Sequence, residues 1–163
     1  MPDWLPNIGR LLLALASGEG KSLTQMHLQE LVYIAHGWCL ALSGQPLTGD
    51  RPEAMDHGPE YRRMTDYFRR FGARPIEGNW AVEDTSRTDA TLLAGGELSS
   101  TETAILKRVY AEYAPLPTST LATLTRADGT PWWEVYSAGR GRGRDIAHGM
   151  IRAQFEKFAI KRR

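Results

Sequence analysis

Gly20-Lys21-Ser22 has the residue types that end a phosphate-binding P-loop, where backbone amides, a lysine and a hydroxyl group bind nucleotide phosphates and Mg²⁺. That motif also needs a glycine five positions before Gly20, where this chain has Leu15. A P-loop follows a strand, whereas the residues before this one, LLLALA, favour a helix. We therefore predict that residues 17–25 form the turn between two helices and bind no nucleotide.

Histidines are the next candidates, as metal ligands, and the chain has four: His27, His36, His57 and His148. None lies in an HExxH motif or beside a CxxC pair, so the spacing typical of a metal site is missing. We expect no metal, and we expect His27 and His36 to be solvated on the surface of a helix. A cluster that forms only in three dimensions remains an alternative.

Cys39 is the one cysteine and falls among apolar residues at helical spacing, which predicts a small buried hydrophobe rather than a nucleophile. The sequence has no G-x-S-x-G motif and no acidic pair spaced for acid–base catalysis. We expect no catalytic residue and no cofactor, so the chain is not expected to be an enzyme. A hydrolase or transferase built from scattered His and Asp is the enzymatic alternative.

Composition sets the class of protein. The chain has 163 residues, the size of one domain, and it is 42% hydrophobic and 24% charged, which is typical of a globular protein. A single cysteine fits a reducing compartment. No apolar run approaches the ~20 residues of a bilayer span, and the start lacks the basic residues of a secretion signal. We expect a cytoplasmic location and no membrane contact.

Apolar residues at steps of three and four predict an all-α domain of six to seven helices, with at most a small β-hairpin around residues 75–98. The clearest helix spans residues 24–42 and ends at Gly44; Ser22 with Gln25 is a possible capping box at its start, and Thr24 is a competing N-cap. Its expected inward face ends at Leu42. Pro59 is expected at the first position of a second helix.

Local signals place the other helices. Ser99 with Glu102 forms a capping box, and Thr130 precedes Pro131 as an N-cap. Together with apolar spacing, these signals predict further helices over residues 7–16, 99–113, 118–124, 131–136 and 145–160.

Charge is unevenly distributed along the chain. Residues 136–163 carry a net charge of +6, and residues 1–135 carry −5. The sequence GRGRGR (139–144) is expected to be a flexible link, and its Arg142 and Arg144 have the backbone freedom to follow a nucleic-acid strand. A nucleic-acid-binding regulator is therefore the alternative function, although no aromatic residue lies within this run for base stacking.

Three segments together resemble a known family: LQELVYIAHGWCLALSGQPL, EAMDHGPEYRRMTDYFRRFG and TLTRADGTPWWEVY. Their order and spacing are similar to those of Panacea-domain proteins, also called SocA-like or phage-associated GepA-like proteins. The resemblance divides the chain into an N-terminal helix and turn (1–22), a helical core (23–136), and an Arg-rich link with a C-terminal helix that packs on the core (137–163).

The matching positions have a structural role in this interpretation. They are Leu28, Leu31, Tyr33, Ala35, Gly37, Trp38, Pro46, Leu47, Glu53, Ala54, Gly58, Pro59, Thr125, Pro131 and Trp132. Two positions depart from the family pattern: Met55 stands where the family usually has Trp, and Arg126 stands where it usually has His. The missing His further weakens an enzymatic interpretation.

The resemblance implies an antitoxin of a toxin–antitoxin module, often phage-borne, that neutralises a protein toxin by direct binding. One branch of the family instead delivers its toxin to an ATP-dependent protease as an adaptor. Exposed arginine and tryptophan residues are enriched where proteins bind one another. The residues expected to contact the partner are Arg62, Arg69, Arg126, Trp133, Arg142 and Arg144.

Overall fold

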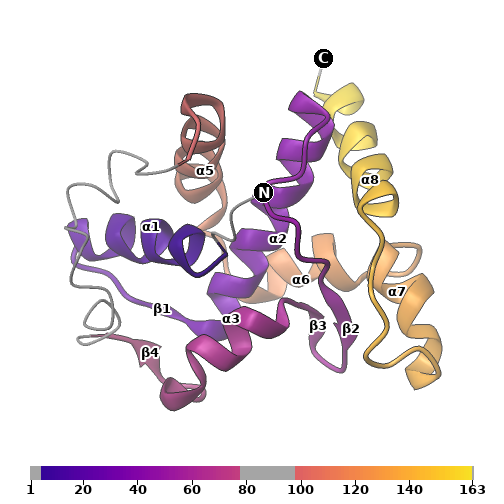
Figure 1. Cartoon of the computed structure of the whole chain (residues 1–163), viewed down its shortest axis with the longest axis horizontal. Coiled ribbons are helices and arrows are strands. Elements are labelled where there is room, and N and C mark those ends of the chain that lie inside the picture. Colours follow the sequence, from indigo (N-terminus) through magenta and orange to yellow (C-terminus); the bar gives the residue numbers. More distant parts are fainter. Residues whose placement is uncertain (1–4, 78–97, 163) are drawn as a thin grey trace.

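Seven α-helices make up most of the part of the chain that the structure, a computed structural model, describes: residues 5–77 and 98–162 (Figure 1). They are α1 (Leu5–Gly18), α2 (Gln25–Ser43), α3 (Arg62–Tyr67), α5 (Ser100–Tyr113), α6 (Thr118–Arg126), α7 (Pro131–Tyr136) and α8 (His148–Lys161). Short elements accompany them: η1 (Arg69–Phe71), η3 (Ser137–Gly139), β1 (Leu23–Thr24), β2 (Glu53–Met55), β3 (Gly58–Glu60) and β4 (Pro75–Ile76). The strands form only two antiparallel pairs, so the predicted all-α class is confirmed. None of these helices is long and apolar enough to span a bilayer.

Helix α2 runs through the middle of the molecule, with α8 alongside it (Figure 1). Its side chains from Leu28 to Leu40 are almost all buried, because α1, α5, α6 and α8 contact it on different sides. The spacing predicts that only one face of α2 is buried, whereas the structure buries this helix on several sides. Leu42 is 62% exposed, so its predicted inward position is wrong: the last turn of α2 extends beyond the helices that cover it.

Local capping fixes the ends of α2 and of two later helices. Thr24 accepts a hydrogen bond from the backbone of His27, and Gly44, at φ 72°, donates its N–H to the carbonyl of Leu40. Ser99 forms the predicted capping box with Glu102. The hydroxyl of Thr130 caps α7, which has a proline in its first turn. These predicted helix ends are confirmed.

The contact between α2 and α8 depends on Gly37. A Cβ atom built on Gly37 would lie 2.2 Å from the ring of Phe155, which is fully buried. The absence of a side chain therefore lets the ring lie against the α2 backbone. Trp38 contacts the same ring edge-on, with 5.6 Å between ring centroids, and donates Nε1–H to the Tyr113 hydroxyl at 3.1 Å.

Strands β2 and β3 form a hairpin at the start of the second motif segment. Pro59 lies in β3 opposite Ala54, and α3 begins only at Arg62, so the predicted helix start at Pro59 is wrong. Ala54 directs its N–H to the carbonyl of Arg144 and its carbonyl to the N–H of Gly143, both at 2.8 Å. Ala54 and Pro59 thus exchange no backbone hydrogen bond across the hairpin. The missing N–H of proline therefore costs no hydrogen bond at this position.

The glycine–arginine segment 139–144 forms turns and bonds to β2 at its end, where an isolated bridge joins Asp145 to Glu53. Besides its two bonds to Ala54, it is followed by a bond from the Ile146 N–H to the carbonyl of Pro52 at 2.8 Å. A Cβ on Gly141 would lie 1.7 Å from the carbonyl oxygen of Val135, so only glycine fits. The segment predicted as a flexible link is therefore bonded to β2 at its end, and Gly141 permits close packing on the backbone of Val135.

Strand β4 pairs with β1 in an antiparallel arrangement. Leu23 lies opposite Ile76, and both side chains are buried. Most of the predicted 75–98 hairpin falls on residues 78–97, outside the described residues. The last helix begins at His148, three residues later than predicted, after the bonded segment ends.

Candidate protein-interaction site

The β2–β3 hairpin, residues 53–60, is the point where distant segments meet. Trp132 on α7 donates its Nε1–H to the carbonyl of Met55 at 2.7 Å. Its ring stacks on Tyr136, with the ring centroids 4.6 Å apart and the planes 16° apart. Proline at the start of α7 and the Thr130 cap set the direction in which Trp132 leaves the helix. The second and third motif segments are therefore in direct contact.

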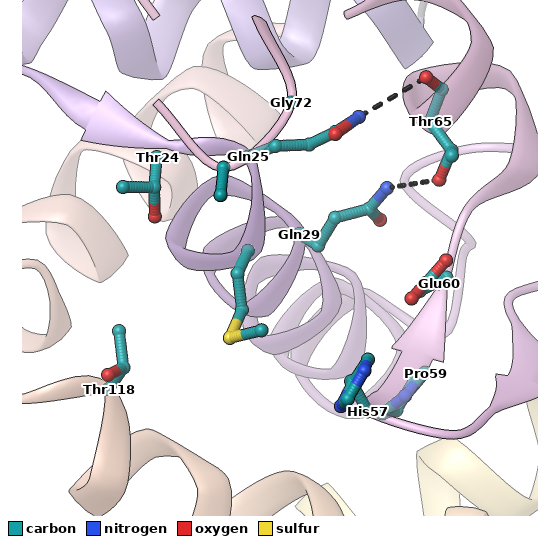
Figure 2. Close-up of a pocket in the computed structure, with 11 residues that line it drawn as sticks. Thr24, Gln25, Gln29, His57, Pro59, Glu60, Thr65, Gly72 and Thr118 are labelled. Carbon is teal, nitrogen blue, oxygen red and sulfur yellow. Dashed lines mark hydrogen bonds between the residues drawn. The ribbon is translucent and has the colours of Figure 1, made fainter. Parts of the chain in front are cut away.

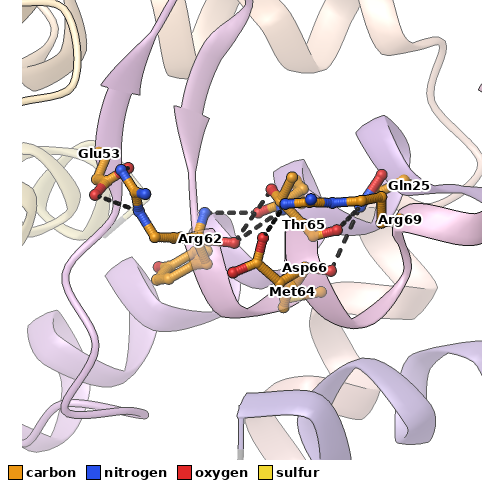
Figure 3. A network of polar contacts seen from close by, with 9 residues as sticks. Gln25, Glu53, Arg62, Met64, Thr65, Asp66 and Arg69 are labelled. Atoms are coloured by element: carbon orange, nitrogen blue, oxygen red, sulfur yellow. Dashed lines mark hydrogen bonds and ion pairs between the residues drawn. The ribbon is translucent and has the colours of Figure 1, made fainter. Parts of the chain in front are cut away.

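Ion pairs and hydrogen bonds surround the hairpin. At its turn, the exposed Asp56 accepts bonds from the Tyr136 hydroxyl at 2.7 Å and from Arg142 Nε at 3.0 Å. The Tyr136 bond and then the Arg142 bond and charge hold the pKa of Asp56 below its usual value. Arg62 binds Glu53 through two bonds of 3.0 and 3.1 Å (Figure 3). Both arginines are therefore held at the hairpin while their side chains remain more than half exposed.

Arg126, the replacement for the family His, also lies against the hairpin. Its Cδ lies 3.1 Å from where a Cβ on Gly58 would be, and Gly58 has φ 123°, which favours glycine. Glu30 on α2 is 6% exposed, and its Oε2 has no hydrogen-bond partner among the described residues. Burial raises the pKa of Glu30 to about 7, and the charge of Arg126 partly opposes that rise. Arg126 thus combines packing on Gly58 with charge compensation.

The structure brings together most of the residues predicted to contact a partner. Arg62, Arg126 and Arg142 all touch the hairpin, and Arg144 is bonded to it through its backbone. Trp133 follows the hairpin-bound Trp132 and is 48% exposed. We call these five residues, with Glu53 and Asp56, the hairpin surface.

Arg69 is the exception. It lies in η1 and pairs with Asp66 at the end of α3, separate from the Glu53–Arg62 pair (Figure 3). The helix predicted from Pro59 is therefore shorter than expected, because α3 ends at Tyr67 and a 3-10 turn follows it.

The family-motif residues are mainly buried, as the structural interpretation expects. Leu28, Leu31 and Leu47 belong to the core, and the Tyr33 hydroxyl donates to Gln154 at 3.3 Å. The hydroxyl of Thr125 donates to the carbonyl of Leu121 inside α6. Pro46 is half-buried, and Pro131 is buried at the start of α7. These residues position the hairpin and its neighbours instead of forming the exposed surface.

The sequence interpretation missed Gln29, which binds the chain just after the hairpin. Its Oε1 accepts the N–H of Tyr61 at 2.9 Å, and its Nε2 donates to the carbonyl of Tyr61 at 3.2 Å. One turn earlier, Gln25 donates to the carbonyls of Met64 and Thr65 (Figure 3). The available signal was a pair of glutamines four residues apart on a helix that is otherwise mostly apolar.

A pocket of about 570 Å³ opens between α2, the hairpin and the start of α6. Figure 2 shows Gln25 and Gln29 on the α2 side, and His57 and Glu60 on the hairpin side. Thr118 closes the pocket from α6.

Two histidines lie together inside the fold. His36 is fully buried, its ring centroid is 4.7 Å from that of His148, and neither of its nitrogens has a hydrogen-bond partner in the described residues. Burial, and then His148, lowers the pKa of His36 to about 3. The prediction of a solvated His36 is wrong because α2 is covered on all sides. His27 is half-buried, and burial lowers its pKa as well. Within the described residues, no three His, Cys, Asp or Glu side chains gather in a metal-binding arrangement.

Residues 19–22 form a turn that follows a helix, as predicted. The Lys21 N–H bonds to the carbonyl of Ala16, which ends α1, and Gly20 has φ 69°. The Lys21 ammonium pairs with Glu19 at 3.2 Å. Cys39 is buried among apolar residues, also as predicted, and burial raises the pKa of its thiol to about 12.

A family model described as antitoxin SocA-like, Panacea domain, matches residues 28–133. The matched range begins in α2, includes the hairpin and ends on α7, so it contains all three motif segments. No curated protein and no solved structure matches the chain significantly. The family description is consistent with an antitoxin role. Because the match covers well over half of the sequence, this chain belongs to the antitoxin SocA-like, Panacea-domain family.

Proposed function

We propose that this protein is an antitoxin that neutralises a cognate protein toxin by binding it directly through the hairpin surface. The observation that carries the proposal is the contact of two motif segments at the hairpin, through Trp132 and Met55. Two further observations support it: Arg62, Arg126 and Arg142 touch the same hairpin, and Trp133, the residue next to Trp132, is exposed. Tryptophan and arginine are the residue types that contribute most at protein interfaces.

The proposed mechanism is occlusion, with no chemical step. A stable complex of this kind buries roughly 1,200–2,000 Å² of surface in total, which would cover a functional region of a small toxin. Arg62 and Arg142 are already held by Glu53 and Asp56, so less side-chain freedom is lost when a partner binds. We assign no catalytic residue and no cofactor, and we propose a cytoplasmic site of action.

The test is co-expression with the product of the adjacent open reading frame, scored as growth rescue, followed by affinity measurement on the purified pair. We expect Trp133→Ala and Arg142→Ala each to weaken binding by roughly 10-fold or more. Arg108→Ala on α5 is the matched control, since Arg108 is exposed and pairs only with Glu112 on its own helix. Unchanged rescue and affinity in both hairpin-surface variants would reject this surface.

The alternative mechanism is that this protein binds the same toxin and delivers it to a protease as an adaptor. An adaptor shortens the lifetime of the toxin in cells, whereas an occluding antitoxin leaves it unchanged or lengthens it. Measuring the decay of toxin after translation arrest, with and without this protein and in cells lacking individual ATP-dependent proteases, separates the two mechanisms.

The nucleic-acid alternative requires basic side chains that are available to phosphates. In the C-terminal segment, Arg142 pairs with Asp56, Arg152 with Glu156, and Arg162 with Glu112. These pairs reduce the charge on which phosphate binding depends. Arg140→Gln with Arg144→Gln is the suitable variant because it leaves the backbone bonds to β2 in place. A salt-sensitive gel shift that this variant abolishes would favour the regulator.

A further inference from the structure

The pocket between α2 and the hairpin has one carboxylate in an otherwise neutral and largely apolar wall. The side chain of Met26, which is 46% exposed, and the buried ring of Pro59 line it, together with the amide side chains of Gln25 and Gln29. Among the described residues that line the pocket, Glu60 is the one acidic residue, and none is a lysine or arginine. Figure 2 shows the Glu60 carboxylate on the hairpin side of this space, with His57 below it.

Glu60 is only partly solvated and has no ion-pair partner among the described residues. It is half-buried where β3 ends, and burial raises the pKa of its carboxyl above the usual value. His57 and a bond with Thr65 oppose this rise only in part. The neighbouring acids Glu53 and Asp56 are by contrast each paired with an arginine. Of the three acidic residues of the hairpin, Glu60 is thus the one without an arginine partner in the described part of the chain, and it is the one at the pocket.

These features define which ligand fits. An acidic group would be repelled by Glu60, and a purely apolar group would remove water from the carboxylate without replacing it. A lysine or arginine side chain has an aliphatic stem for Met26 and Pro59 and a cationic end for Glu60. The volume of about 570 Å³ accommodates one such side chain together with adjoining backbone.

We propose that this pocket receives a lysine or arginine side chain of the protein toxin, with Glu60 as its counter-charge. The proposal rests on the proposed function for the identity of the partner. The pocket shares the hairpin with the hairpin surface, so one toxin can contact both. Glu60 then adds a charge contact that selects a basic group of the toxin and so helps to fix the orientation of the complex.

The test compares the wild-type protein with Glu60→Gln, which keeps the shape of the side chain, and with Glu60→Lys. We expect Glu60→Gln to weaken toxin binding by roughly 10-fold and Glu60→Lys to weaken it further. Glu134→Gln on α7, an exposed residue outside the pocket, is the control and should bind like the wild type. Thermal unfolding of each variant shows whether the fold is intact. Folded Glu60 variants with wild-type affinity would overturn the proposal.

Charge reversal on the toxin identifies the contact. Each surface lysine or arginine of the toxin is changed to glutamate and paired with Glu60→Lys, and one pair should recover at least 10-fold of the lost affinity. Absence of recovery for every basic position would overturn the proposal.

A second arm uses this protein alone, so that it does not depend on the toxin. Short peptides of the form acetyl-Ala-Arg-Ala-amide and acetyl-Ala-norleucine-Ala-amide are titrated while the backbone amide resonances of Gln25, Gly72 and Ala73 are followed. We expect shifts with the arginine peptide that are lost in Glu60→Gln, and smaller shifts with norleucine. Equal shifts with both peptides would reject the charge-based pocket even if the antitoxin function is correct. Selective arginine shifts with no toxin binding would instead reject the antitoxin function and retain the pocket.

Discussion

Polar side chains on α2 differ in how completely the fold satisfies them. Gln29 uses both ends of its amide to bind the backbone of Tyr61, so its burial is compensated. Glu30, its neighbour in sequence, is equally buried but has an oxygen without a hydrogen bond, and only the charge of Arg126 offsets its desolvation. The first residue stabilises the position of the hairpin, whereas the second makes folding depend on pH.

Glu30→Gln should remove part of that pH dependence. The pKa of Glu30 is raised in the folded protein, from 4.5 to about 7, so the folded state binds this proton more tightly than the unfolded state. The contribution of Glu30 to the free energy of unfolding therefore falls as pH rises from about 4.5 to 7. We expect Glu30→Gln to be more stable than the wild type at about pH 8, by on the order of 1 kcal/mol because solvent screens part of the shift, and to be similar near pH 4.5.

Urea unfolding of both proteins across this pH range is the measurement, with the exposed Glu134→Gln as the control that should follow the wild type. His36 contributes with the opposite sign, because its folded pKa of about 3 makes stability decrease as pH falls below 6.5. Comparing variant with wild type at each pH cancels the histidine contribution. A stability difference that does not change with pH would contradict the assignment to Glu30.

Whether a residue's role could be predicted depends on how far along the chain its contacts lie. Gln29 was not identified from the sequence because its partners lie about 30 residues away, beyond any local pattern. The chemical types of Arg62, Arg126 and Arg142 marked them as interface candidates. Their meeting at the hairpin depends on tertiary contacts with Glu53, Gly58 and Asp56, which the sequence does not order in space.

At the scale of elements, helices with local end signals were predictable and the hairpin was not. The Ser99–Glu102 box and the Thr130 cap lie within four residues of the ends that they define. The hairpin is held by Trp132 and by the segment around Arg144, more than 70 residues later in the chain. Pro59 therefore satisfied the local rule for a helix start. The hydrogen bonds that join residues 132, 143 and 144 to the hairpin nevertheless favour a strand at this position.

Gly37→Ala tests the most demanding contact between elements, that of α2 with α8. The new Cβ would lie 2.2–2.6 Å from three ring atoms of Phe155, and this ring has no space to move because it is fully buried. We expect a loss of about 1–3 kcal/mol in the free energy of unfolding, although alanine is the better helix former. Chemical denaturation gives this value directly.

Gly149→Ala on α8 is the matched control, because no atom lies within 4 Å of its added Cβ. It should leave stability unchanged or raise it slightly. Adding Phe155→Leu to Gly37→Ala should recover part of the loss, since a smaller side chain leaves room for the methyl group. A Gly37→Ala protein as stable as the wild type would show that α2 and α8 do not pack this closely.

At the scale of the whole molecule, the family match ends at residue 133 but the core does not. Ile146, Ile151 and Phe155 lie beyond the match and are fully buried. The last of these fills the space beside Gly37, and the segment before α8 completes the sheet edge at β2. We therefore predict that the core of residues 23–136 and the packed C-terminal segment form one folding unit.

A chain truncated after Tyr136 should therefore fail to fold cooperatively. Exposing the sites of Ile151 and Phe155 alone removes burial worth about 2–5 kcal/mol for each side chain, a large share of the 5–15 kcal/mol that stabilises an ordinary domain. We expect the truncated chain to keep helical far-UV circular dichroism but to lose a sharp thermal transition. Adding residues 137–163 as a separate peptide should restore the transition in a concentration-dependent way. A truncated chain that unfolds as sharply as the full protein would instead establish residues up to 136 as an independent domain, and α8 would then be free to leave the core when a partner binds.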